Sequence, residues 1–181
     1  MRVIAGKAGG IRLKSIDTKE VRPTLDRVKE AVFSMILPYF PFEAGLDLFA
    51  GFGSLGLEAA SRGTKHVTFI EKNRRYADII RENIKKCGFE ESCEVMTENV
   101  FTYTQTVNKK HDIVFLDPPY KNNMVNKTLR SLINNELLRA GALIIVEHHR
   151  DEEIEDFEEF KILKDRNYNE TVIKVYFYEG E

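Results

Sequence analysis

Short apolar runs recur through the middle of the chain and predict β-strands. A near-continuous apolar run is typical of a strand that is covered on both faces of a parallel sheet. The strands predicted in this way are 45–50, 66–71, 93–98, 111–117 and 142–148.

Between these runs the apolar residues recur near the 3.6-residue period of an amphipathic helix. In the segment 74–86, for instance, Ile79, Ile80 and Ile84 fall on one side of such a helix. The helices predicted from this pattern are 24–37, 55–62, 74–86 and 124–135.

The alternation of strands and helices predicts an open, doubly wound α/β sheet with right-handed crossovers. Gly63, Gly88 and Gly141 stand where its helices are expected to end. The last two apolar stretches, FKILKDRNYN and ETVIKVYFY, meet near Asn169 and predict an antiparallel pair. Ligands of such sheets bind beyond the carboxyl ends of the strands, so functional residues are expected at that edge.

The first residues lie outside this alternation. The stretch VIAGKAGGIRLKS predicts a small hairpin that turns at Ala8-Gly9-Gly10. The sequence therefore predicts two parts, an N-terminal basic hairpin or arm at 1–19 and an α/β domain at 20–181.

Length and composition fit one α/β domain with a substantial core, since 43% of the 181 residues are hydrophobic. No apolar run approaches the length of a membrane span, and the N-terminal residues lack the apolar stretch of a secretory signal. Two cysteines, Cys87 and Cys93, are typical of reduced thiols, so a cytoplasmic location is expected. No CxxC or HExxH spacing occurs, and no metal site is expected.

Charge is unevenly distributed, although the formal net charge is only −2. Residues 1–30 carry eight basic and four acidic side chains, whereas residues 151–160 carry seven acidic and no basic ones. The basic end is therefore the candidate surface for a polyanion, with Lys7, Arg12 and Lys14 as candidate nucleic-acid contacts. Such contacts would be directed at phosphates and would weaken strongly with salt.

A glycine-rich loop follows the first predicted strand. Gly51, Gly53 and Gly56 satisfy the G-x-G-x-x-G spacing, and Glu71 follows the second strand 20 residues after Gly51. Glycines let the backbone approach a ligand closely, and an acidic side chain after the second strand can accept hydrogen bonds from ribose hydroxyls. This combination predicts a nucleoside-containing cofactor.

Asp47, four residues before Gly51, favours one cofactor over another. A carboxylate near a diphosphate is unfavourable by Coulomb's law, which argues against NAD. S-adenosylmethionine has no phosphate and carries a sulfonium and an ammonium cation. The position of Asp47 therefore favours the methyl donor.

The fourth predicted strand ends in Asp117-Pro118-Pro119-Tyr120. A base amino group is a poor nucleophile because its lone pair is delocalised into the ring, and hydrogen-bond acceptors directed at its hydrogens stabilise the charge that develops on methylation. Asp117 and the Pro118 carbonyl are such acceptors, and prolines offer no competing N–H. Tyr120 offers a face on which an extruded base can stack.

DPPY resembles the catalytic motif of methyltransferases that act on amino groups of nucleic-acid bases. MRVIAGKAGGIRL, RPTLDRVKEAVFSMIL and LDLFAGFGSLGLEAASRG, at 1–13, 22–37 and 46–63, extend the resemblance to the bacterial 16S ribosomal RNA guanine-N2 methyltransferase family (RsmD-like). The resemblance implies a Rossmann-like class I methyltransferase fold, with a seven-stranded, mostly parallel sheet and an antiparallel last strand. It also implies S-adenosylmethionine as donor and guanine N2 of 16S rRNA, in an assembling small ribosomal subunit, as acceptor.

The resemblance also implies roles for individual residues. Asp117, Pro118 and Tyr120 would contact the guanine. The residues implied to bind the donor are Asp47, Gly51 and Gly53 at the methionine portion, Glu71 at the ribose, Asn99 and Val100 at the adenine, and Arg22 and Thr24 at the pocket wall. Asn99 departs from the family pattern, in which an acidic residue is common at this position; its side-chain oxygen is still expected to accept from the adenine amino group.

Three alternatives stay open at this point. A DNA adenine-N6 or cytosine-N4 methyltransferase uses the same tetrapeptide, but such an enzyme usually needs additional sequence to recognise its DNA site. An NAD-dependent oxidoreductase shares the glycine loop but does not explain Asp47 or DPPY. A non-catalytic ribosome-assembly module would need neither motif intact. The sequence does not indicate an oligomeric state.

Overall fold

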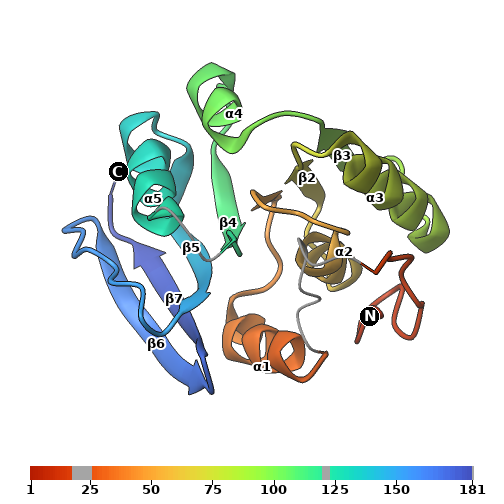
Figure 1. Ribbon diagram of the computed structural model, residues 1–181, viewed down its shortest axis with the longest axis horizontal. Coiled ribbons are helices and arrows are strands. Elements are labelled where there is room, and N and C mark those ends of the chain that lie inside the picture. Colours follow the sequence, from red (N-terminus) through yellow and green to blue (C-terminus); the bar gives the residue numbers. More distant parts are fainter. Residues whose placement is uncertain (18–25, 120–122, 181) are drawn as a thin grey trace.

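The computed structural model describes residues 1–17, 26–119 and 123–180 (Figure 1). Its centre is a seven-stranded sheet in the order β3-β2-β1-β4-β5-β7-β6. The strands are β1 Ala44–Asp47, β2 His66–Ile70, β3 Cys93–Met96, β4 His111–Leu116, β5 Leu138–His149, β6 Phe160–Tyr168 and β7 Thr171–Tyr178.

Strands β1 to β5 pair in parallel, whereas β7 pairs antiparallel with both β5 and β6. The turn between β6 and β7 contains Asn169 at φ 58°, in the left-handed region that asparagine tolerates. The predicted mostly parallel sheet and its antiparallel last strand are confirmed.

Helices connect the parallel strands and cover the sheet (Figure 1). They are α1 Asp26–Ile36, α2 Ser54–Ser61, α3 Arg74–Cys87, α4 Val100–Thr106 and α5 Met124–Asn134, with a 3₁₀ turn η1 at Leu37–Tyr39. The predicted start of the first helix, at residue 24, lies outside the described residues. Helix α4 was not predicted, because the threonine-rich stretch VFTYTQT has no clear apolar period. No helix in the described ranges is long and apolar enough to cross a membrane.

The core has two main layers because alternate strand residues face opposite sides of the sheet. Val114 and Ile144 pack with α5 on one face, and Phe115 and Ile145 pack with α1 and α2 on the other. A continuous apolar strand is therefore explained by burial on both faces, as the sequence pattern predicts.

Gly141 does not end a helix, contrary to the sequence-based prediction. Helix α5 ends earlier, and Gly141 lies inside β5 at φ 79°. The pairing of β5 with β4 shifts there, from His111–Leu138 to Ile113–Leu143. Gly141 therefore allows the strand to shift its register, because this irregularity needs a positive φ just as a helix end does.

The N-terminal segment 1–17 forms a hairpin-like loop that packs against the domain (Figure 1). Arg2 and Arg12 form an antiparallel bridge, and the amides of Val3 and Gly10 close the loop through bonds to Ile11 and Val3 carbonyls, each 2.9 Å. The buried side chains of its apolar residues join those of β2 and α3. The predicted domain boundary between residues 19 and 20 lies outside the described residues.

Candidate cofactor and catalytic site

The carboxyl ends of four neighbouring parallel strands place four of the predicted site residues along one edge of the sheet: Asp47, Glu71, Asn99 and Asp117. Asp47 at the end of β1 is in register with Phe115 of β4, and the Leu48 amide donates to the Phe115 carbonyl at 3.1 Å. Asp117 follows two residues later. The glycine loop and the DPP segment are therefore neighbours in space, although 64 residues separate Gly53 from Asp117.

Backbone conformation explains the glycines of the loop. Gly51 and Gly53 have φ of 56° and 84°, which only glycine adopts at little cost. Gly56 has a different reason: an added Cβ would lie 2.3 Å from the Phe69 ring, so only glycine lets α2 approach β2 this closely.

Glu71 ties the loop to the second strand. Its Oε2 accepts from the Gly51 amide at 3.0 Å and its Oε1 accepts from the Asn73 amide at 2.7 Å. The carboxylate is half-buried at the sheet edge. Each carboxylate oxygen can accept a further hydrogen bond, so the position remains compatible with ribose hydroxyls.

Asp47 is buried beneath α2, with 2% of its surface exposed. Its Oδ2 accepts from the Gly56 amide at 3.0 Å. Burial raises the pKa of Asp47 to about 7; the hydrogen bonds from the Gly56 and Phe49 amides oppose this rise, while the charge of Glu71 adds to it. The side chain therefore supports the loop from below through the Gly56 amide.

Asn99 caps α4, its side chain accepting from the Phe101 amide at 2.8 Å. Because an amide oxygen has two lone pairs, one acceptor position remains for a ligand. Val100 is the first residue of α4 and is buried. Both residues stand at the carboxyl end of β3, the strand next to Glu71.

Asp117 lies just after β4 and is half-buried, and Pro118 is buried beside it. Of the other predicted site residues, Tyr120, Arg22 and Thr24 lie outside the described residues. The described residues lie at neighbouring strand ends, and their roles in binding and catalysis stay predictions.

The predicted nucleic-acid contacts lie on the N-terminal segment and are exposed. The Lys7 amide donates to the Ser61 carbonyl on α2 at 2.8 Å. Lys14 pairs with Glu82 on α3 at 2.6 Å, and the Arg12 carbonyl accepts from Lys86 at 2.6 Å. The segment therefore presents its cations from a position fixed by two helices.

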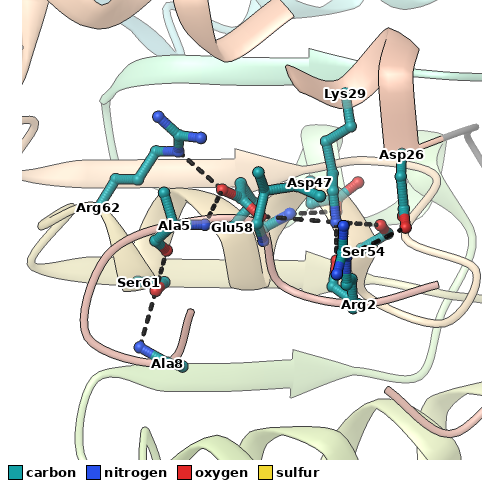
Figure 2. A network of polar contacts seen from close by, with 12 residues as sticks. Arg2, Ala5, Ala8, Asp26, Lys29, Asp47, Ser54, Glu58, Ser61 and Arg62 are labelled. Atoms are coloured by element: carbon teal, nitrogen blue, oxygen red, sulfur yellow. Dashed lines mark hydrogen bonds and ion pairs between the residues drawn. The ribbon is translucent and has the colours of Figure 1, made fainter. Parts of the chain in front are cut away.

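A buried charge cluster that the sequence did not indicate joins the N-terminal segment to α1 and α2 (Figure 2). Glu58 is fully buried, and its carboxylate accepts from the amides of Ile4 at 2.6 Å and Ala5 at 3.1 Å. Arg62 donates to it at 2.7 Å, and Lys29 lies 3.5 Å away with no exposed surface. Multiple hydrogen bonds compensate the desolvation of these charges.

Lys29 also donates to the Arg2 carbonyl at 2.5 Å and to Ser54 Oγ at 3.1 Å. Burial lowers the pKa of Lys29, and the charge of Glu58 opposes that effect. Since Ser54 is the first residue of α2, directly after Gly53, the cluster reaches the end of the glycine loop.

Asn83 is a second buried link that sequence reasoning missed. Its Oδ1 accepts from the Lys14 amide at 2.7 Å, and its Nδ2 donates at 3.0 Å to the carbonyls of both Lys14 and Phe52. Asn83 has no exposed surface, and Phe52 lies between the two loop glycines. One amide in α3 therefore holds the N-terminal segment against the glycine loop.

Within the described ranges, no group of three or more His, Cys, Asp or Glu side chains has the arrangement of a metal site. The polar groups at the sheet edge are two carboxylates that accept from backbone amides, a capping asparagine and a third carboxylate at Asp117.

Comparison with known proteins assigns the chain to a family. The model of the family described as conserved hypothetical protein 95 matches residues 1–177. The chain belongs to this family. The ribosomal RNA small subunit methyltransferase D of Haemophilus influenzae is 36% identical over 179 residues, which cover 97% of this chain and 93% of that protein.

Solved structures have the same fold as this chain. An Escherichia coli protein whose description names it provisionally as a methyltransferase has a TM-score of 0.88 at 29% identity, covering 100% of this chain and 99% of that one. An RNA methyltransferase from Salinibacter ruber, solved with S-adenosyl-L-homocysteine, has a TM-score of 0.66 at 18% identity, covering 88% and 95%. At that identity the likeness concerns the fold alone.

Proposed function

We propose that this chain methylates the exocyclic N2 of a guanine in 16S rRNA, with S-adenosylmethionine as the methyl donor. Family membership and the Haemophilus influenzae relative support methylation of small-subunit ribosomal RNA. The observation that carries the reaction type is the adjacency of two strand ends: the glycine loop after β1 lies beside Asp117 after β4.

The residues of the first strand end fit the proposed donor. Gly51 and Gly53 leave the backbone open to close approach, and Glu71 stands at the sheet edge with acceptor capacity for ribose hydroxyls. Asn99 at the next strand end offers an acceptor to an adenine amino group. When bound, S-adenosylmethionine would supply a methyl group on a positively charged sulfur.

The residues of the second strand end fit an amino-group acceptor. The Asp117 carboxylate and the Pro118 carbonyl would accept from the two hydrogens of the guanine amino group, which favours a pyramidal, nucleophilic nitrogen. As the N–C bond forms, the nitrogen becomes positive and its proton becomes acidic. That proton would leave to Asp117 or to water, and the donor would keep the electron pair of its S–C bond.

An rRNA acceptor is favoured over DNA because the Haemophilus influenzae relative, which is aligned over 97% of this chain, is named a ribosomal RNA methyltransferase. Segment 1–17, which carries the predicted nucleic-acid contacts, packs on α2 and α3. We infer that the assembling small subunit, rather than a DNA site, presents the target base.

A methyl-transfer assay with tritium-labelled donor tests this proposal. The acceptors are naked DNA, free 16S rRNA and small-subunit particles, and the labelled nucleotide is then mapped in the RNA. We expect label in N2-methylguanosine with rRNA or particles and none with DNA. Label in DNA, or at another position of the guanine, contradicts the proposal.

A further inference from the structure

We propose that the groove between residues 14–16 and the first half of α3 binds the sugar-phosphate backbone of the RNA substrate. This α3 groove has a volume of about 540 Å³, and its walls include Lys14, Ile16, Arg74, Arg75, Asp78 and Glu82. The inference rests on the proposed function, and it assigns the surface on which the RNA lies before its base enters the catalytic site.

Charge is the first support. Arg74 and Arg75 are exposed, and neither forms an ion pair with any residue that the structure describes. The two acidic wall residues are already engaged, Glu82 by Lys14 at 2.6 Å and Asp78 by Arg81 at 2.9 Å. The two arginines are therefore the groove charges left for a ligand, and guanidinium groups match phosphate oxygens in a bidentate geometry.

Helix stability does not explain the two arginines. They occupy the first turn of α3, where the helix dipole disfavours cations by a few tenths of a kcal/mol or more per residue. An acidic residue at either position would favour the helix. An anionic ligand explains two cations at this place better than helix stability does.

Position is the second support. Arg74 is three residues after Glu71, whose carboxylate bonds the Gly51 amide, so the groove begins beside the candidate donor site. The opposite wall is fixed by Asn83, which bonds both backbone groups of Lys14 and the Phe52 carbonyl of the glycine loop. A ligand in the groove is thereby held at a set distance from the donor loop.

The distribution of charge over the molecule also favours RNA binding on the α3 side. The β3 edge, with α3 and segment 1–17, lies on one side of the sheet, and the β6–β7 pair lies on the other (Figure 1). The acidic segment 151–159 precedes β6 and would repel a polyanion there. RNA is therefore directed to the α3 side by attraction at one edge and repulsion near the other.

The test compares two charge reversals of equal size. The double variant R74E/R75E changes the groove, and K161E/K164E places the same charge change on exposed positions of β6 at the far edge. Equilibrium binding of in vitro transcribed 16S rRNA is measured for each at several salt concentrations, and binding of S-adenosylmethionine is measured by calorimetry. A thermal melt of each variant shows whether it is folded. The neutral variant R74Q/R75Q shows whether removing the positive charge, without adding a negative one, also weakens RNA binding.

We expect R74E/R75E to weaken RNA binding at least tenfold and to make the slope of log K against log salt shallower by roughly 1.5, the value for two lost phosphate contacts. K161E/K164E should change RNA affinity less than threefold, and donor affinity should be unchanged in both. Equal losses in the two variants, no loss in R74E/R75E, or a loss of donor affinity in that variant would overturn the inference.

The two proposals fail in different ways. If the native chain binds RNA through the groove but transfers no methyl group to it, the proposed function is wrong and the inference about the groove is supported. If the native chain methylates 16S rRNA and R74E/R75E keeps its RNA affinity and KM for RNA, the inference about the groove is wrong and the proposed function is supported.

Discussion

The two neighbouring strand ends that form the candidate site use the same side chain differently. Asp47 at the end of β1 is almost fully buried, and a backbone amide of α2 donates to it. Asp117 after β4 is half-buried and is followed by prolines that carry no N–H. The first carboxyl group therefore supports a loop, and the second is the one that we propose meets the substrate.

The surroundings of the two ends differ as well. The loop after β1 is linked to distant segments by Glu71, by Asn83 and by the Lys29–Glu58 cluster. The core beside β4 is packed mainly by apolar side chains of α5 and β5. The proposed donor site is thus held by buried polar links, whereas the proposed acceptor site rests on apolar side chains.

The largest expected effect is on catalysis at the β4 end. Asp117→Ala should lower the single-turnover rate of methyl transfer roughly 10³-fold, because it removes the acceptor that stabilises charge on the attacking nitrogen. Donor affinity, measured by calorimetry, should be unchanged. Asp165→Ala, on the far edge strand, is the matched control and should keep the rate. A retained rate in Asp117→Ala removes the proposed role.

The next effect concerns stability and pH at the β1 end. Burial raises the pKa of Asp47 from 3.8 to about 7, so the folded protein keeps a proton that the unfolded chain has released between these values. The stability that this proton provides is fully present below about pH 4 and is lost as pH rises through 7, by roughly 4 kcal/mol at most. The free energy of unfolding of Asp47→Asn should not fall in this way, because the amide side chain does not titrate.

Urea unfolding of the donor-free protein at pH 4, 5.5 and 7 measures that difference. The native chain should lose stability relative to Asp47→Asn across the series. A difference that stays constant, or that changes in the other direction, means that Asp47 is ionised in the folded protein throughout this range.

A smaller effect is expected at the link between the N-terminal segment and the loop. Asn83→Leu keeps the volume but leaves buried backbone groups of Lys14 and Phe52 without partners, which should cost about 2–3 kcal/mol of unfolding free energy. KM for the donor should also rise, since the glycine loop loses its support. Asn108→Leu, in an exposed loop, should change neither quantity. Destabilisation with an unchanged KM would limit Asn83 to a structural role.

The smallest effect is expected at Glu71. Glu71→Gln keeps one carbonyl oxygen for the Gly51 amide but weakens acceptance from ribose hydroxyls. Donor affinity should fall about tenfold, equivalent to about 1.4 kcal/mol, with the rate at saturating donor little changed. Calorimetry and steady-state rates separate the two quantities, and a lowered rate with unchanged affinity would contradict this assignment.

Local patterns in the sequence determined the element types and the candidate edge. Apolar runs predicted five parallel strands to within a few residues, because burial on both faces demands such runs. The spacing of Gly51, Gly53 and Glu71 and the DPPY tetrapeptide marked the candidate site, since backbone conformation and acceptor chemistry depend on residue type at fixed short spacing.

The tertiary structure decided what depends on segments far apart in the chain. It made β1 and β4 neighbours, placed Gly141 in a strand irregularity, and buried Asn83 against a segment 69 residues away. It also buried Lys29, whose charge alone predicts an exposed side chain. Such contacts have no local signal, because a polar residue that faces solvent and one that meets a buried partner look the same in sequence until the chain has folded.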